Sequence, residues 1–460
     1  MMNRDIQKEI TEFIDKHYEQ IFRDIAKLVA VNSVEELGKD DTPFGPGPKK
    51  ALECALEIAG ELGLNTHNCE DKIGYACIGG DSDKYLATIT HVDVVPAGNG
   101  WKADPFVMRD VEGYIIGRGV LDDKGPSVIC LYALKFIKES GISLKYPIRA
   151  LLGANEETGM RDVGHYLAHY PAPLFCFSPD ADFPLICGEK GIWHGKMFAC
   201  SKADAIVDIH GGVAVNAIPD LCEATVKAEK LESTAEVEAV QEGTLWHLTA
   251  HGVAGHASMP EGTKNAIGVM LDYILANNLA KGKEKDFLEA AARVHHAWDG
   301  SKIGIAAQSE GFTPLTIVSG MIGVDDGVIR QTLDSRYVPT ITGEEILNRM
   351  QENFGDAAIV ECSRDAAPFY KSPDSAEIVA CMKAFYEVTG SDAAPFTIGG
   401  GTYSRDFPNA VGFGPEYANR KRPGFAGSIH GAEEAASKEE LLEALKIYIL
   451  ALLNLEEIDF

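Results

Sequence analysis

The stretch 147-PIRALLGANEETG-159 joins an apolar run to two adjacent glutamates. The run predicts a buried strand, and the acids follow at the point where that strand ends. Two other short apolar runs end in the same way: 85-YLATIT-90 leads into His91, and 173-PLFCFSP-179 leads into Asp180. Because ligands of open α/β sheets bind outside the carboxyl ends of the strands, we expect these polar side chains to meet at one site.

Around these strands the chain alternates between helical and extended patterns. From about residue 50 to 182, helical segments alternate with short apolar strands, which is typical of a largely parallel α/β sheet flanked by helices. An opening amphipathic helix is expected over residues 5–30, and a further helix over 374–390. Ser437 and Glu440 have the spacing of a capping box and predict the start of a last helix.

Beyond Asp182 the pattern changes. Longer alternating stretches follow, such as 245-LWHLTAHGVAG-255 and 314-PLTIVSGMIGV-324, together with one long helical segment expected at about 266–297. This change predicts a separate α+β domain. The length of 460 residues agrees, since it exceeds what one compact core usually holds.

The composition excludes several classes of function. Lys and Arg total 42 against 69 Asp and Glu, and the formal net charge of −27 repels nucleic acids and anionic membranes. Ten cysteines are scattered without a CxxC pair, which favours reduced core residues of a cytoplasmic protein. The N-terminal segment lacks the apolar core of a signal peptide, and the longest aliphatic run, 447-IYILALL-453, is too short to span a bilayer. We expect no nucleic-acid partner and no membrane anchor.

His91 is followed two residues later by Asp93, in 91-HVDVVP-96. A carboxylate at that spacing can accept the second N–H of the imidazole, as the partners of metal-ligating histidines do. A lone histidine is more often structural, so the pattern gains weight only from its neighbours.

Acidic pairs occur at two of the expected strand and helix ends. In 117-GRGVLDDKGP-126, Asp122 and Asp123 stand at a helix entrance, where an N-cap needs only one carboxylate. Glu156 and Glu157 end an extended segment, so their side chains point to opposite sides. Buried carboxylates are costly unless they are neutralised. One glutamate can therefore hold a metal, while the other serves as a general base for a water.

Two histidines and three acids form a candidate ligand set: His91, Asp122, Glu157, Asp180 and His430. Nitrogen and oxygen ligands without a thiolate suit Zn²⁺, Mn²⁺ or Co²⁺, among which the sequence does not choose. One open catalytic zinc takes three protein ligands, so a larger set fits two divalent metals joined by a bridging carboxylate.

Eight segments resemble, in order along nearly the whole chain, the aminoacylase and dipeptidase family of dinuclear metallopeptidases, family M-twenty. Within it the chain is most similar to the PepV-like and Sapep-like dipeptidases. The segments are 89-ITHVDVVP-96, 117-GRGVLDDKGP-126, 154-ANEETG-159, 178-SPDADFP-184, 210-HGGVAVNAIPD-220, 255-GHASMP-260, 399-GGGTYSR-405 and 429-IHGAEE-434.

The resemblance implies how the ligands are shared between the metals. His91 and Asp180 would hold one metal, Glu157 and His430 the other, and Asp122 would bridge them.

It also implies roles for the remaining acids. Glu156 would be the general base that activates the attacking water, and Asp93 would be the partner of His91. A cis peptide is implied between Asp122 and Asp123.

The family's lid domain corresponds to residues 187–370, inserted into a discontinuous catalytic domain of residues 1–186 and 371–460. An enlarged lid is typical of the PepV-like branch and implies a monomer in which His256 reaches its own active site. With Asn216 it would stabilise the tetrahedral oxyanion. Without the resemblance, Asn216 could belong to a turn before Pro219, and His256 could simply be exposed.

Arg336 could pair with Asp334 at a strand edge, whereas the resemblance implies that it meets the terminal carboxylate of the substrate. The glycine loop at 399–405 lacks the Gly-Lys-Ser/Thr ending of a nucleotide loop. Its backbone N–H groups would cradle the same carboxylate. The residues concerned are Gly400, Gly401, Thr402 and Tyr403.

Taken together, the resemblance implies hydrolysis of small dipeptides that carry a free C-terminal carboxylate. An N-acyl amino-acid deacylase or a carboxypeptidase of the same family stays open as an alternative. So does a metal-dependent binding protein without catalysis. The presence of Glu156, which a mere metal binder does not need, favours an enzyme.

Overall fold

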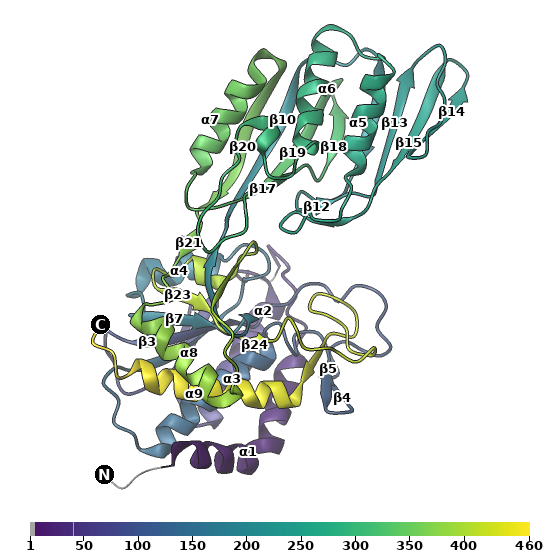
Figure 1. Ribbon diagram of the computed structural model, residues 1–460. Coiled ribbons are helices and arrows are strands. Elements are labelled where there is room, and N and C mark those ends of the chain that lie inside the picture. The colour runs from purple at the N-terminus through teal and green to yellow at the C-terminus, as the bar shows by residue number, and fades with distance from the viewer. Residues whose placement is uncertain (1–4, 40) are drawn as a thin grey trace. The chain divides into compact units, whose positions relative to one another are not determined.

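The computed structural model describes residues 5–39 and 41–460 and divides into two compact units (Figure 1). Unit 1 comprises the chain up to Cys187 together with Lys371–Phe396 and Thr402–Phe460, and unit 2 comprises Gly188–Tyr370 together with Thr397–Gly401. The sequence did not indicate that residues 397–401 belong with unit 2. No helix among the described residues has both the length and the apolar character that crossing a bilayer requires.

A mixed sheet runs through unit 1 in the order β1-β2-β6-β3-β7-β23-β9. Its centre is parallel, because β3 pairs with β6 and β7, and β7 pairs with β23. Antiparallel strands complete its edges. The strands are β1 Asn65–Cys69, β2 Ile73–Ile78, β3 Leu86–His91, β6 Ile148–Gly153, β7 Phe175–Ser178, β9 Ile186–Glu189 and β23 Ala410–Gly412. The α/β class with a mixed sheet, predicted from the sequence, is confirmed.

Helices cover both faces of this sheet, as its strand residues show. Alternate residues such as Leu86 and Ile148 join one apolar cluster with α1, α2, α3, α8 and α9, while Ala87 and Leu151 join another with α4. Because successive strand residues point to opposite faces, both faces of the central strands are apolar. The helices are α1 Ile6–Val29, α2 Pro46–Glu61, α3 Lys124–Ser140, α4 Arg161–His169, α8 Ala376–Thr389 and α9 Lys438–Leu455.

Short strands of unit 1 bring distant loops together. β25 Ala435–Ser437 pairs antiparallel with β5 Tyr114–Ile116, which pairs with β4 Arg109–Val111. β8 Ala181–Asp182 pairs with β24 Pro415–Glu416. The first pairing places the segment before β25 next to the segment that follows β5.

Unit 2 is built on an antiparallel sheet in the order β14-β15-β13-β11-β18-β19-β10-β20. Three helices, α5, α6 and α7, pack against this sheet (Figure 1). The strands are β10 Gly191–Lys202, β11 Ile206–Gly211, β13 Leu221–Lys227, β14 Val237–Glu242, β15 Leu245–His251, β17 Thr316–Val318, β18 Ile322–Asp325, β19 Val328–Tyr337 and β20 Ala358–Ala366. β17 pairs with β19, and β21 Phe369–Tyr370 pairs with β9.

The single long helix expected at 266–297 is wrong. The structure has two helices there, α5 Ala266–Ala276 and α6 Gly282–His295, and a third, α7 Gly343–Phe354, later in the unit. Asn278 adopts a left-handed backbone with φ of 52°, a conformation that ends helices and that Asn tolerates better than most residues. The apolar pattern continues across this break because both helices face the same sheet.

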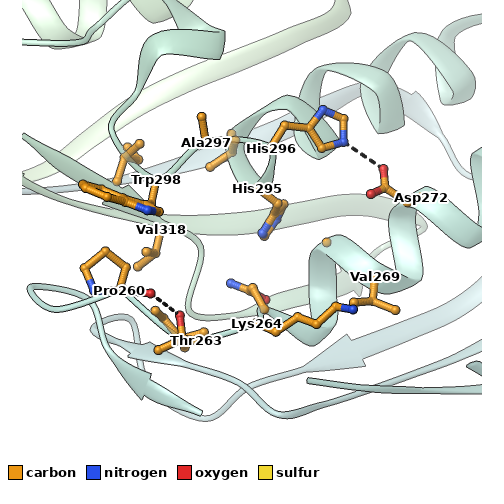
Figure 2. A pocket seen from close by; sticks show the side chains of 15 residues that line it. Pro260, Thr263, Lys264, Val269, Asp272, His295, His296, Ala297, Trp298 and Val318 are labelled. Atoms are coloured by element: carbon orange, nitrogen blue, oxygen red, sulfur yellow. Dashed lines mark hydrogen bonds and ion pairs between the residues drawn. The ribbon is translucent and has the colours of Figure 1, made fainter. Parts of the chain in front are cut away.

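A cavity of about 240 Å³ lies in unit 2, beside α5 and the end of α6 (Figure 2). His295 and Trp298 line it, and His296 turns toward Asp272, whose Oδ1 lies 2.9 Å from its Nε2. None of the site residues predicted from the sequence lines this cavity. The cavity is therefore separate from the predicted site residues.

Candidate active site

The five expected metal ligands all lie in unit 1. The sheet brings three of them to one edge, and the loops before α3 and β25 carry Asp122 and His430. His91 is the last residue of β3, and Asp180 follows β7 by two positions. Because β3, β6 and β7 are parallel neighbours, their carboxyl ends share one edge of the sheet. Asp122 arrives from the segment before α3, and its peptide bond to Asp123 is cis, as the resemblance implied.

Asp122 lies between two histidines. Its Oδ1 is 2.9 Å from Nε2 of His91, and its Oδ2 is 2.9 Å from Nε2 of His430. The same nitrogen of His430 lies 3.1 Å from Oε2 of Glu157, and Nε2 of His91 lies 3.8 Å from Oδ2 of Asp180. One carboxylate therefore reaches two separate groups of ligand atoms.

The two adjacent glutamates belong to two different sets of possible metal ligands, and His91 is a member of both sets. Ligand atoms of His91, Asp122 and Glu157 lie within 4.8 Å of one another, and so do those of His91, Glu156 and Asp180. The sequence predicted opposite directions for the two side chains from an extended backbone, but β6 ends at Gly153 and both glutamates lie in the turn that follows it.

The carboxylates repel one another in a buried setting. Burial, reinforced by the charge of Asp180, holds the pKa of Glu156 well above its usual range. Burial and the charge of Asp122 raise the pKa of Asp180 to about 8. Burial opposes the ionisation of Asp122 as well, but contacts with His430 and His91 outweigh it and keep its pKa below the ordinary value. Such a cluster is costly without a cation to neutralise it.

The orientation of His91 fits a metal ligand. Its Nδ1 lies 3.0 Å from the backbone carbonyl of Asp93, which can only accept, so Nδ1 carries the proton. In the neutral ring Nε2 then presents a lone pair to carboxylate oxygens, and this buried atom has no hydrogen-bond partner. A proton or a metal ion must lie between these facing lone pairs, since Nε2 is only 2.9 Å from Oδ1 of Asp122. Imidazole nitrogen and carboxylate oxygen suit Zn²⁺, Mn²⁺ or Co²⁺.

Asp93 differs in detail from the sequence prediction. Its carboxylate oxygen lies 3.5 Å from Nδ1 of His91, farther than its own carbonyl. The carboxylate instead accepts hydrogen bonds from the backbone N–H groups of Glu156 and Glu157, both at 3.1 Å. Those two donors occupy the side-chain oxygens, so the backbone orients the imidazole while the side chain fixes the two glutamates.

In unit 2, Asn216 and His256 lie side by side. β12 Ala217–Ile218 pairs with β16 Gly255–His256, and the carbonyl of Asn216 accepts from the N–H of Ala257 at 3.0 Å. Nδ1 of His256 accepts from the N–H of Ser258 at 3.1 Å, which leaves the proton of a neutral ring on Nε2. Burial and the charge of Arg336 lower the pKa of this imidazole and favour that neutral donor.

Of the two contacts expected for Arg336, the structure shows the one with Asp334. Its Nε and Nη2 donate to the two carboxylate oxygens of Asp334, at 2.8 Å and 3.2 Å. Its Nη1 donates to the carbonyl of Gly399 at 2.9 Å, which ties this arginine to the glycine loop within unit 2. Asp334 also lies 3.0 Å from Nε2 of His194. The guanidinium is thus held in a fixed orientation.

The glycine loop is divided between the two units, with Gly400 and Gly401 in unit 2 and Thr402 and Tyr403 in unit 1. The side chain of Tyr403 is fully buried and donates to Asp162, so it offers no surface to a substrate. The oxygen of Thr402 accepts from the N–H of Ser404 at 3.1 Å. The expected contact of this loop with a substrate carboxylate was through backbone N–H groups, and it stays a prediction.

Tyr403 instead supports the strand that precedes the glutamates. Asp162, its partner, also accepts from the N–H groups of Ala154 and Asn155, at 2.8 Å and 3.0 Å. A Cβ added at Gly153 would lie 2.0 Å from the hydroxyl of Tyr403. Only glycine leaves room for this buried pair beneath the end of β6.

We expect Gly153→Ala to lower the free energy of unfolding by about 1–3 kcal/mol, because overpacking a buried site displaces groups that have no room to move. Denaturant titration measures the change. Gly164→Ala in α4 is the control, since a Cβ there meets nothing within 4 Å. Its helix is expected to gain about 0.5–1 kcal/mol. Equal stabilities of the Gly153 and Gly164 variants would contradict the packing described.

Sequence reasoning missed three buried residues around the site: Asp162, Arg118 and Glu434. Arg118 and Glu434 stand inside segments 117–126 and 429–434, which were singled out for their neighbours. The adjacent acids Glu433 and Glu434 were the available signal. Nothing in the local pattern marked Asp162.

Comparison with known proteins agrees with the geometry. Residues 87–454 match the model of peptidase family M20/M25/M40. The Beta-Ala-Xaa dipeptidase of Lactobacillus delbrueckii subsp. lactis is 31% identical over 96% of this chain and 97% of its own. Among solved structures, the fold resembles the dipeptidase Dug1p of Saccharomyces cerevisiae, with a TM-score of 0.60, 15% identity and 99% of each chain covered. Human carnosine dipeptidase 1 follows, with a TM-score of 0.56, 14% identity and coverage of 99% of this chain and 100% of its own.

The family match spans most of the chain and includes all eight segments that suggested the resemblance. The resemblance predicted from the motifs is confirmed. The chain therefore belongs to peptidase family M20/M25/M40 and is a hydrolase of the metallopeptidase type.

Proposed function

We propose that this protein is a metal-dependent dipeptidase that cleaves dipeptides with a free C-terminal carboxylate. The observation that carries the proposal is the position of Asp122 between His91 and His430, with both nitrogen–oxygen distances at 2.9 Å. The printed name of the 31% identical relative, a dipeptidase, supports the substrate class.

The ligands divide into two groups around Asp122. We assign His91 and Asp180 to one divalent cation, Glu157 and His430 to the other, and Asp122 to both. When bound, the two ions supply Lewis acidity to the peptide carbonyl and lower the pKa of the attacking water. Zn²⁺ and Mn²⁺ both suit these donors, and Co²⁺ is a usable substitute.

Glu156 is the proposed general base. It takes a proton from the attacking water and then delivers it to the leaving amine, so one carboxylate serves both halves of the reaction. The hydrogen bond from its N–H to Asp93 fixes the backbone from which this side chain projects.

Unit 2 supplies donors for the substrate. We assign Nε2–H of His256 and the amide of Asn216 to the oxyanion, because both residues are exposed and are brought together by the pairing of β12 with β16. Arg336, Gly400, Gly401 and the N–H of Thr402 are assigned to the terminal carboxylate. A fixed carboxylate site is expected to favour dipeptides over longer peptides.

Activity of chelator-treated protein reloaded with Zn²⁺ or Mn²⁺ tests this function. The panel contains dipeptides, tripeptides and N-acetyl amino acids. Restored cleavage of dipeptides, with little activity on the other substrates, is the expected result. Exclusive cleavage of acyl amino acids would favour the deacylase alternative, and metal binding without any hydrolysis would favour a binding protein. The monomeric state and the cytoplasmic location stay predictions from the sequence.

A further inference from the structure

A buried ion pair lies at the centre of the loops that carry the proposed ligands. Arg118 and Glu434 are 1% and 0% exposed, and Nη1 of the arginine is 2.5 Å from Oε2 of the glutamate. A buried pair of this kind needs further hydrogen bonds to offset the loss of hydration. The partners of these two side chains are backbone groups of the ligand-bearing loops.

The carboxylate of Glu434 accepts hydrogen bonds from the backbone of the loop that ends in Asp122. Its Oε1 accepts from the backbone N–H groups of Gly119 at 3.0 Å, Leu121 at 3.1 Å and Asp122 at 3.3 Å. One oxygen thus fixes the path of the chain over the residues that deliver the proposed bridging carboxylate. The pairing of β25 with β5 brings this glutamate to the loop.

The guanidinium of Arg118 binds the backbone of the loop that carries His430. Its Nη2 donates to the carbonyl of His430 at 3.2 Å and to the carbonyls of Pro96 and Ala97, both at 3.4 Å. The backbone of His430 is left-handed, with φ of 59°, which is uncommon for a residue other than glycine. A donor on its carbonyl therefore helps to hold a conformation that the chain would not adopt unaided.

We propose that Arg118 and Glu434 are positioning residues that set the spacing between Asp122 and His430 and thereby the affinity for the metal ion that these two ligands share. The inference rests on the proposed metal centre. Its reason is geometric, because the pair holds the backbones of both ligands while their side chains stand 2.9 Å apart. Outer partners of metal ligands commonly change metal affinity by about 10- to 100-fold.

The chain offers a matched control beside this pair. Glu433 is also buried and also binds an arginine, since its Oε1 accepts from Nη2 of Arg109 at 2.7 Å. It accepts from the backbone N–H of Lys102 at 2.9 Å as well. Neither Arg109 nor Lys102 is next to a proposed ligand in the chain. Glu433→Gln and Glu434→Gln therefore differ chiefly in which loops lose hydrogen bonds.

The test is a chelator competition with Zn²⁺ or Mn²⁺ on the full chain. In Glu434→Gln an amide NH₂ faces either Arg118 or the backbone N–H groups, so one set of contacts is lost. We expect the affinity for one of the two ions to fall about 10- to 100-fold in Glu434→Gln, and to change less than about threefold in Glu433→Gln. With Co²⁺, the visible absorption bands should shift in Glu434→Gln but not in Glu433→Gln, because they report the ligand geometry.

A second variant keeps the test decisive if Glu434→Gln does not fold. Arg118→Lys retains the charge, but one ammonium cannot replace the planar fork that serves Glu434 and His430 together. Thermal unfolding of the metal-free variants shows which of them are folded. Arg118→Lys is expected to weaken the same ion and to shift the same Co²⁺ bands.

The outcomes separate the inference from the proposed function. Two ions bound by the unmodified protein, with unchanged affinities and Co²⁺ bands in both Glu434→Gln and Arg118→Lys, would overturn the positioning role and leave the metal centre intact. Failure of the unmodified protein to bind any ion, or unchanged binding in Asp122→Asn, would overturn the proposed centre and the inference with it.

Discussion

Replacing Glu156 by Gln is expected to lower kcat by about 10²- to 10⁴-fold, the usual contribution of a general acid–base group. Glutamine keeps the size and polarity of the side chain but accepts no proton at neutral pH. The measurement is steady-state hydrolysis of a dipeptide by the metal-loaded variant, with metal content determined on the same sample. The expected pattern is low kcat with two ions still bound.

Metal content decides between two roles for this residue. Ligand atoms of Glu156, His91 and Asp180 lie within 4.8 Å of one another, so the geometry also permits Glu156 to be a ligand. If that were its role, Glu156→Gln would lose one ion together with activity. Glu157→Gln is the matched control, because the adjacent residue is the proposed ligand and is expected to lose affinity for its ion. Activity that survives Glu156→Gln would refute the assignment of the base.

Replacing His256 by Ala is expected to lower kcat by about 10²- to 10³-fold while KM changes little, the pattern for loss of an oxyanion donor. The N–H of Ser258 occupies Nδ1, so the proton on Nε2 is the one left to donate. This interaction strengthens as negative charge develops on the carbonyl oxygen, and its loss therefore affects the transition state more than the bound substrate. Separate determination of kcat and KM on one dipeptide tests it.

His251→Ala is the control for His256→Ala, since His251 is an exposed histidine at the end of β15 in the same unit. It is expected to leave both constants unchanged. A rise in KM with unaltered kcat in His256→Ala would mean that the imidazole binds the substrate in its ground state. An unchanged ratio kcat/KM would remove His256 from the site.

The sequence was most informative where polar residues stand at or just after the end of a strand. His91, Glu157 and Asp180 were placed together because strands of a parallel centre finish at one edge, a rule that needs no knowledge of their contacts. His430 was harder, because it lies 250 positions after Asp180 and no local pattern connects the two. The ordered resemblance supported its place in the set.

What the sequence did not predict depends on where side chains point after the chain has packed. Tyr403 belongs to a glycine-rich segment that was interpreted through its backbone N–H groups, and nothing in that pattern indicated that its ring is buried and its hydroxyl meets Asp162. For Asp93 the sequence predicted a side-chain contact with His91, but its backbone carbonyl makes the 3.0 Å contact, while two backbone N–H groups donate to its carboxylate. The break at Asn278 between α5 and α6 interrupts a periodicity that both helices share.

The division of unit 1 by residues 188–370 has a consequence for protein synthesis. Helix α3 packs against α9, which is translated after the whole of that insertion. At roughly 5–20 residues per second, ribosomes need about 10–40 s for the inserted stretch. During this interval the early part of unit 1 waits with apolar surface uncovered, while residues 188–370 can already fold. The nascent chain also remains without its full ligand set until His430 has emerged, so hydrolytic activity is expected to arise only after unit 1 has closed.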